Sequence, residues 1–149
     1  MNIKTKEFEM TKWEYYKVLM IETLKRIWWL IVFIAIMTIL NRDSFAIVFT
    51  FVFVVFLMLY NYYFVNSRAN KSFFSKRYFE VNDEFLSGYV KDGSEGKINL
   101  NNVVKVVKNK SYFLIYISKV TFYYIPLNAF YSSEDIDSLY ALLRTKTKK

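Results

Sequence analysis

The stretch that decides the fold covers residues 27–65 and has the sequence IWWLIVFIAIMTIL-NRDS-FAIVFTFVFVVFLMLYNYYFV. It holds two uncharged apolar runs, residues 27–40 and 45–65, joined by a short polar segment. A helix needs about 20 apolar residues, at roughly 1.5 Å each, to cross about 30 Å of hydrocarbon. The second run is long enough by itself, whereas the first reaches this length only together with residues from its N-terminal flank. The sequence therefore predicts a transmembrane helical hairpin, with spans at about 22–40 and 45–65.

The alternative is a buried helix pair in the core of a soluble protein. A chain of 149 residues has little polar surface with which to cover two such runs, because small domains bury only a modest share of their surface. The hairpin is the better interpretation. It divides the chain into a cytosolic segment and juxtamembrane helix at 1–26, the hairpin at 27–65, and a second cytosolic domain at 72–149.

The amino-acid composition excludes several kinds of catalytic and metal-binding site. The chain has no cysteine and no histidine, so it lacks thiolate metal ligands, disulfides and the commonest general base. The carboxylates fall in predicted turns and at a helix start, where structural roles suffice. No phosphate-binding glycine loop is present. We therefore expect no catalytic residues, no metal site and no cofactor; an enzyme is the weakest of the function classes.

Lysine and arginine flank the hairpin on one side. The segment before it carries six of them, and the segment after it carries Arg68, Lys71, Lys76 and Arg77 without an acid. The connecting segment has only Arg42. The positive-inside rule then predicts a membrane protein with two passes and both termini in the cytoplasm.

Two sets of residues are candidates for membrane contact. Trp28, Trp29, Tyr62 and Tyr63 are expected as interfacial anchors, because tryptophan and tyrosine gather at the membrane–water boundary. Arg68, Lys71, Lys76 and Arg77 hold half of the net charge of +8 and are expected to contact anionic lipid headgroups. Nucleic-acid binding, the competing use of a basic cluster, is disfavoured by this position. Thr38, Thr50 and Asn61 are expected to bond across the helices rather than to line a transport path. A two-helix pump is disfavoured, although a homo-oligomer could still build a pore.

Local signals predict the remaining elements. Thr11 and Glu14 form a capping box that opens one long helix, from about residue 12 to residue 40, and residues 2–9 alternate weakly, as an edge strand does. Further strands are expected at 76–81, 85–91, 97–100, 103–107, 111–118 and 120–125. Ser132 is an expected N-cap, and it precedes an apolar helical stripe of Ile136, Leu139, Tyr140 and Leu143. The expected fold is membrane α+β, with a small antiparallel sheet or partial barrel closed by a C-terminal helix.

The order of these segments resembles the YcxB-like bacterial membrane proteins. The resemblance covers about residues 5–145 and is strongest over 96–140. Its most specific piece is YIPLNAF, residues 124–130, followed by SSED at 132–135. It implies two membrane helices and a C-terminal domain related to bacterial pleckstrin-homology-like folds, and it carries no catalytic motif to this chain.

Two non-enzymatic functions remain open. Bacterial pleckstrin-homology-like membrane proteins include self-protection factors, so the resemblance implies an immunity protein against a membrane-active bacteriocin or toxin. The alternative is a membrane adaptor whose cytosolic domain binds a protein, peptide or lipid in signalling or transport. Anionic membrane lipids and a toxin, peptide or membrane protein are the expected partners.

Overall fold

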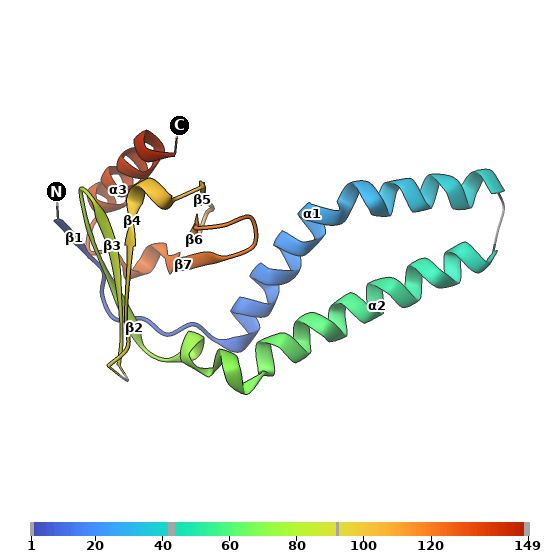
Figure 1. Cartoon of the computed structure of the whole chain (residues 1–149), viewed down its shortest axis with the longest axis horizontal. Coiled ribbons are helices and arrows are strands. Elements are labelled where there is room, and N and C mark those ends of the chain that lie inside the picture. The colour runs from blue at the N-terminus through green and yellow to red at the C-terminus, as the bar shows by residue number, and fades with distance from the viewer. Residues whose placement is uncertain (1, 42–43, 92, 148–149) are drawn as a thin grey trace. The chain divides into compact units, whose positions relative to one another are not determined.

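The computed structural model describes residues 2–41, 44–91 and 93–147. The chain forms two compact units. The helical unit is Met10–Phe74, and the sheet unit combines Met1–Glu9 with Ser75–Lys149. Figure 1 shows the elements of each unit. Residues 42 and 43 of the predicted external loop lie outside the described part of the chain.

The helical unit consists of two long antiparallel helices and a short 3-10 segment: α1 (Lys12–Asn41), α2 (Ser44–Asn66) and η1 (Arg68–Phe74). The predicted capping box is confirmed, because Thr11 N–H donates to Glu14 Oε2 at 2.9 Å and Glu14 N–H donates to Thr11 Oγ1 at 3.2 Å. With its first N–H groups satisfied, and with no proline or glycine along it, α1 runs unbroken to the end of its apolar stretch.

Few of the described side chains of the helix pair are buried. Val18 and Val65 are buried, and Asn61 donates to Met20 Sδ at 3.4 Å and to its own helix at Leu57 O at 2.8 Å. The predicted bond across the helices is therefore found for Asn61. It is wrong for Thr38, whose hydroxyl donates to Ile34 O within α1 at 2.9 Å.

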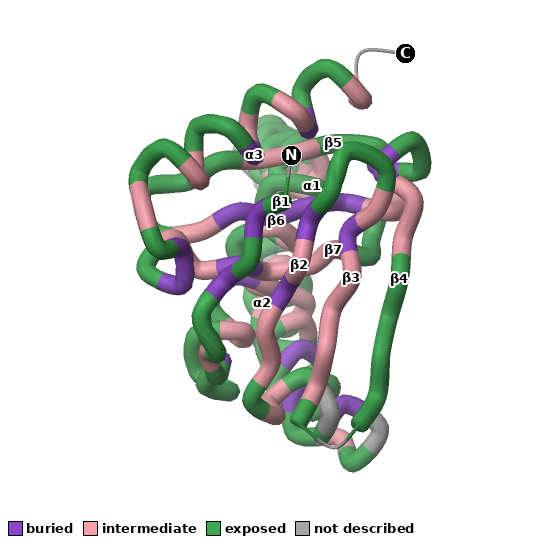
Figure 2. Tube along the Cα trace, turned by 90° about the vertical axis from the view of Figure 1, so that its left-hand side faces the viewer, coloured by how far each residue is buried: buried purple, intermediate pink, exposed green. Residues whose placement is uncertain are grey.

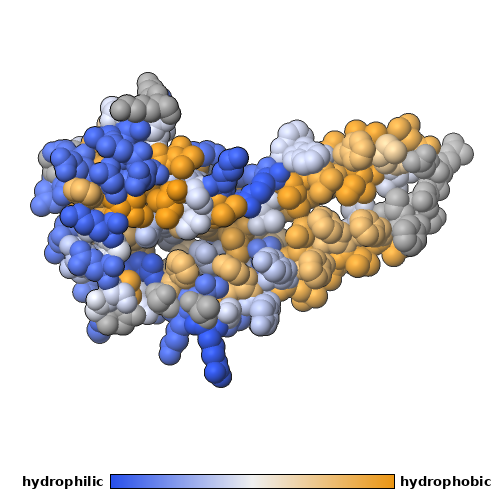
Figure 3. All heavy atoms as spheres, in the orientation of Figure 1, coloured by the Kyte–Doolittle hydropathy of each residue, from blue (hydrophilic) through white to orange (hydrophobic). Residues whose placement is uncertain are grey.

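Most apolar side chains of the helical unit point outward, as the hydrophobic surface of both helices in Figure 3 shows. Within the described residues, one helical segment is long and apolar enough to cross a membrane, namely Ile47–Asn66 of α2. The predicted hairpin of two membrane spans is thus not confirmed. The structure shows a pair of helices, of which one contains a candidate span. The difference follows from composition, because the uncharged run in α1 is only fourteen residues long and Lys25 and Arg26 precede it.

The sheet unit contains two antiparallel sheets and one covering helix. The first sheet has the order β1-β2-β3-β4, with β1 (Asn2–Lys4), β2 (Arg77–Asn82), β3 (Phe85–Val90) and β4 (Glu95–Asn99). The second has the order β5-β6-β7, with β5 (Lys105–Lys108), β6 (Tyr112–Tyr116) and β7 (Phe122–Pro126). Short 3-10 turns η2 (Leu100–Asn102) and η3 (Leu127–Ala129) precede β5 and the final helix α3 (Ser133–Lys146). The antiparallel α+β prediction is confirmed, with the ends of β2 to β7 within two residues of those expected, while β1 is shorter than the expected 2–9.

The N-terminal residues are part of this unit. Ile3 faces Val81 in the β1–β2 pair, so the weak alternation of residues 2–9 does indicate an edge strand. Beyond β1, Thr5 N–H donates to Phe79 O and Thr5 Oγ1 accepts from Phe79 N–H, both at 2.9 Å. Phe8 and Arg77 exchange two further backbone hydrogen bonds, at 2.9 and 3.0 Å. These bonds join residues that lie about seventy positions apart in the sequence.

The core lies between the two sheets and α3 (Figure 2). The first sheet contributes Phe79, Val81 and Leu86, and the second contributes Phe113, Ile115 and Ile125, all at most 1% exposed. Leu139 and Leu143 of the predicted stripe are fully buried in the same cluster. The predicted N-cap is confirmed, since Ser132 Oγ accepts from Asp135 N–H at 3.1 Å. α3 therefore covers the core, as its stripe predicts.

Candidate functional site

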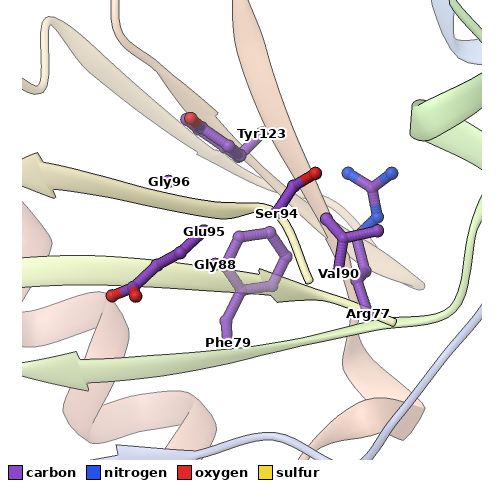
Figure 4. A pocket seen from close by; sticks show the side chains of 8 residues that line it. All are labelled: Arg77, Phe79, Gly88, Val90, Ser94, Glu95, Gly96 and Tyr123. Atoms are coloured by element: carbon purple, nitrogen blue, oxygen red, sulfur yellow. The ribbon is translucent and has the colours of Figure 1, made fainter. Parts of the chain in front are cut away.

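The sheet unit has a pocket of about 210 Å³ between β2, β3, β4 and the strand β7 of the other sheet (Figure 4). Its floor and walls are formed by Phe79, Gly88, Val90, Gly96 and Tyr123, with Arg77 at one end. Ser94 and Glu95 complete the rim. Because β4 and β7 are each the last strand of their sheet, the pocket opens where the two sheets are not joined by a further strand.

Two glycines facing each other make the floor. Gly88 of β3 and Gly96 of β4 are cross-strand partners. The chain has only three glycines, and the backbone requires one at Gly93 alone, whose φ is 90°. Backbone conformation therefore does not explain why glycine occupies positions 88 and 96.

The close approach of Phe79 explains Gly88. A Cβ atom at Gly88 would lie 2.8 Å from Cε1 of the Phe79 ring, so a larger residue would push the ring away. Gly96 has no such neighbour: a Cβ atom there would meet only the Tyr123 hydroxyl, at an ordinary 3.7 Å. Glycine inside a strand costs roughly 0.5–1 kcal/mol relative to alanine. Alanine would therefore fit at Gly96 without a steric clash.

Aromatic rings form the walls. Phe79 is 1% exposed, and its ring centroid lies 5.7 Å from that of Tyr123 in an edge-to-face arrangement at 84°. On another side Phe79 stacks with Phe8 at 5.9 Å. The Phe79 ring is therefore packed between Phe8 and Tyr123.

The electrostatics of the pocket are set by Arg77 and Tyr123. Burial raises the pKa of Tyr123 above its ordinary value, and the nearby charge of Arg77 opposes this pKa rise with a smaller effect. Tyr123 is therefore a neutral phenol at neutral pH. The Arg77 guanidinium therefore lies close enough to Tyr123 for the two groups to interact electrostatically. In Figure 4 the Glu95 carboxylate points away from both, so the pocket lacks a facing acid among the residues drawn.

The four predicted headgroup cations are divided between the two units. Arg68 and Lys71 are exposed on η1 in the helical unit, and Lys76 is exposed just before β2 in the sheet unit. Arg77 is half-buried at the start of β2, where its Nε donates to Ser75 O at 3.4 Å. Of the four, only Arg77 lines the pocket.

The predicted aromatic anchors are all on the surface but lie at two levels of the helix pair. Trp28 and Trp29 are 61% and 60% exposed, and Tyr62 and Tyr63 are 61% and 76% exposed. Met20 contacts Asn61, so the tyrosines lie within about one turn of Met20. The tryptophans follow Met20 by eight and nine positions, which is roughly 12 Å along the helix axis. The two pairs therefore do not form one ring at a single depth.

Sequence reasoning missed the pocket. The predicted turn at 92–96 includes Gly96 and would pair Gly88 with Leu100, whereas the observed register pairs Gly88 with Gly96. Close packing by Phe79 could not be read from the sequence. Within the described residues, no three acidic, histidine or cysteine side chains gather as a metal site would require.

Comparison with known proteins supports the predicted resemblance. No curated protein matches the chain. Among solved structures it is similar to the N-terminal PH domain of the human ARAP2 protein, with 22% identity, a TM-score of 0.38, and coverage of 52% of this chain and 68% of that one. No functional conclusion follows from a likeness at this level. Residues 81–143 match the model of the family described as YcxB-like protein. Over these residues the predicted resemblance to that family is confirmed.

Proposed function

We propose that the chain is a non-enzymatic, membrane-anchored binding protein. In this proposal the helical unit crosses a bacterial cell membrane twice, and the sheet unit, with a pleckstrin-homology-like fold, binds its partner in the cytoplasm. The observation that carries the proposal is the pairing of β1 with β2, because this pairing constrains how the chain between the two strands can run.

Residues 2–8 and 75–147 belong to one folded unit, so they lie on the same side of any membrane. The chain between them must then cross an even number of times or not at all. If α2 crosses, as its length and composition allow, α1 must cross as well. This topological reasoning is independent of the lysine and arginine counts, and it favours the same two-pass arrangement with both ends inside.

The charged residues of α1 fit a membrane boundary that crosses this helix near its middle. Lys25 pairs with Glu22 at 2.8 Å, and both Lys25 and Arg26 are exposed. Residues 22–40 span about 28 Å as a helix, and long basic side chains at the inner end can reach the headgroups. Tyr62 and Tyr63 would then lie near the inner boundary of the hydrocarbon, and Trp28 and Trp29 roughly 9 Å further in. The exposed apolar surface of the helical unit would meet lipid.

Single-cysteine labelling tests the topology, because the chain has no native cysteine to remove. We expect a membrane-impermeant maleimide to label Asp43→Cys from outside in intact cells. We expect Lys119→Cys, an exposed position of the sheet unit, to react only after the membrane is permeabilised. Labelling of both positions from outside, or recovery of the chain in the soluble fraction, would contradict the two-pass proposal.

The most concrete version of the binding role is immunity. The support is the YcxB-like resemblance, together with a sheet unit that carries a preformed pocket. The test is survival of a sensitive Gram-positive host that expresses the full chain, challenged with a panel of membrane-active peptides and toxins. We expect protection by the full chain, and loss of protection in a truncation after Ser75 that still reaches the membrane. Equal survival with and without the full chain, at matched membrane levels, would refute immunity against the agents tested.

A further inference from the structure

The strand β4 is an open edge of the first sheet. β3 pairs with one side of it, and in the part of the chain that the structure describes no strand pairs with the other side. Three successive residues of β4, namely Glu95, Gly96 and Lys97, are exposed, and Figure 2 shows the strand along the rim of the sheet. An open edge presents unpaired N–H and C=O groups to a further strand.

The other edge strands, β1, β5 and β7, are covered or interrupted. Just beyond β1, Lys6 N–H donates to Ala129 O at 2.7 Å. Lys108 of β5 forms an ion pair with Asp137 of α3 at 2.8 Å. β7 ends at Pro126, which has no N–H to donate. β4 is therefore the edge best suited to receive a strand.

The register of β3 and β4 determines which backbone groups of β4 point outward. Ser94 O accepts from Val90 N–H of β3 at 2.9 Å, so Ser94 directs its backbone groups at β3. The direction of these groups alternates along a strand of an antiparallel ladder. Gly96 therefore also faces β3, and the N–H and C=O groups of Glu95 and Lys97 face outward.

The side chains of Glu95 and Lys97 carry opposite charges and lie on the same face of the sheet, since they are two residues apart. On this face Lys97 Nζ lies 4.1 Å from the centroid of the Phe85 ring, and the Glu95 carboxylate interacts with the Tyr89 hydroxyl. A carboxylate can accept from more than one donor. The strand that fits this edge has a base opposite Glu95 and an acid opposite Lys97.

The strand β4 itself meets this requirement. When two copies pair antiparallel about Gly96, Glu95 of each copy lies directly opposite Lys97 of the other. Both outward-facing residues then form hydrogen-bonded pairs, and each pair exchanges its two N–H···O bonds. A pairing centred on Glu95 or on Lys97 would instead place like charges opposite each other, which is destabilising.

We propose that β4 pairs with β4 of a second copy of this chain, antiparallel about Gly96, and joins the two four-stranded sheets into one continuous sheet of a two-fold symmetric dimer. Gly96, where neither the backbone conformation nor a close contact requires glycine, then lies on the two-fold axis. The dimer goes beyond the proposed binding role. It depends neither on immunity nor on the number of membrane crossings.

Disulfide trapping tests the geometry, because the chain has no native cysteine. Opposite residues of a non-hydrogen-bonded pair have Cα atoms about 4.5 Å apart, within the range of about 4.4–6.8 Å that a disulfide requires. Gly96→Cys should therefore give a disulfide-linked dimer when lysates of cells that express the full chain are oxidised with copper phenanthroline. Lys119→Cys, at an exposed position of the same unit, is the control for random collision and should crosslink far more slowly.

Charge variants in the Gly96→Cys background test the register. Glu95→Lys places like charges opposite each other at both symmetric positions, as does Lys97→Glu, and each should lower the initial rate of crosslinking at least about fourfold. The combined swap of Glu95→Lys and Lys97→Glu restores opposite charges and should return the rate to that of the parent. Because the swap also keeps the local net charge, it controls for changes in thiol reactivity. Amide hydrogen exchange of β6 checks that each variant is folded.

Three results would overturn the dimer: crosslinking at position 96 no faster than at position 119, single charge variants that crosslink at the parent rate, or a swap no faster than the single variants. A disulfide between position 96 and a protein other than this chain would also overturn it, because the occupant of the edge would then be a different strand. None of these results affects the survival and labelling tests, and those tests can fail while the dimer forms.

Discussion

The two paired glycines should respond to the same substitution with opposite signs. Gly88 and Gly96 face each other in neighbouring strands, Gly88 in the interior strand β3 and Gly96 in the edge strand β4. What differs is the space above them. Gly88→Ala brings a methyl group to 2.8 Å from the Phe79 ring, whereas Gly96→Ala brings one to 3.7 Å from the Tyr123 hydroxyl.

The magnitudes follow from two opposing contributions. Replacing glycine by alanine inside a strand stabilises by roughly 0.5–1 kcal/mol, and this gain applies at both positions. Overpacking a filled core costs typically about 1–3 kcal/mol, and this cost applies only at Gly88, because Phe79 is 1% exposed and its ring is held by Phe8 and Tyr123. We expect Gly88→Ala to lower the free energy of unfolding of the sheet unit by about 1 kcal/mol net, and Gly96→Ala to raise it by about half that or more.

The assay must report on the sheet unit alone. All three tryptophans lie in α1, so tryptophan fluorescence would follow the helical unit. Amide hydrogen exchange of β2 and β6 at increasing urea, measured on the full chain in detergent, gives the opening free energy of the sheets. In a Phe79→Leu background, which removes the ring atoms nearest Gly88, the Gly88→Ala penalty should shrink. A stabilising Gly88→Ala, or an unchanged penalty in that background, would refute the proposed packing.

Three further substitutions test other contacts of the sheet unit. Thr5→Val removes the hydroxyl that accepts from the buried Phe79 N–H and should cost about 1–3 kcal/mol in the exchange assay; Thr5→Ser should retain most of the stability, and a similar loss in both variants would contradict a role for the hydroxyl. Ser132→Ala removes the cap of the Asp135 N–H and should cost about 1 kcal/mol, while Ser132→Asp should not; a neutral alanine variant in urea unfolding would contradict it. Burial raises the pKa of Tyr123, so its contribution to stability is complete below the unfolded-state value of about 10 and is lost as the pH rises through the folded-state value. Tyr123→Phe should therefore gain stability relative to the parent chain between neutral pH and pH 11, and a pH-independent difference in the free energy of unfolding would contradict the shift.

Much of the fold was predictable because its signals are local. The capping box at Thr11 and Glu14 fixed the start of α1, and Ser132 fixed the start of α3. Alternation and turn residues located the strands, since each depends on a few neighbouring residues. The edge strand β1 was only weakly indicated, because three residues carry little periodic information.

The site was harder to predict because it depends on distant contacts. The pocket joins β2, β3, β4 and β7, and no local pattern states that Tyr123 faces Gly96 across the sheets. The predicted basic cluster was chosen by its position in the sequence, yet Arg77 belongs to the sheet unit while Arg68 and Lys71 belong to the helical unit. Charge counting reveals the number of such groups, and three-dimensional contacts decide which of them share a site.

The backbone bonds between Phe8 and Arg77 have a consequence for protein engineering. They hold the two ends of the segment Met10–Phe74 close together, so the whole helical unit is an insertion at what would otherwise be a tight hairpin turn. Because loop-closure entropy grows only slowly with loop length, such a site can accept sixty-five residues or a handful. Joining Glu9 to Ser75 through a short Asn-Gly turn should yield a water-soluble miniature that keeps all seven strands, α3 and the glycine-floored pocket. Expressing residues 75–149 alone would leave out β1, so the edge of β2 would lose its strand partner.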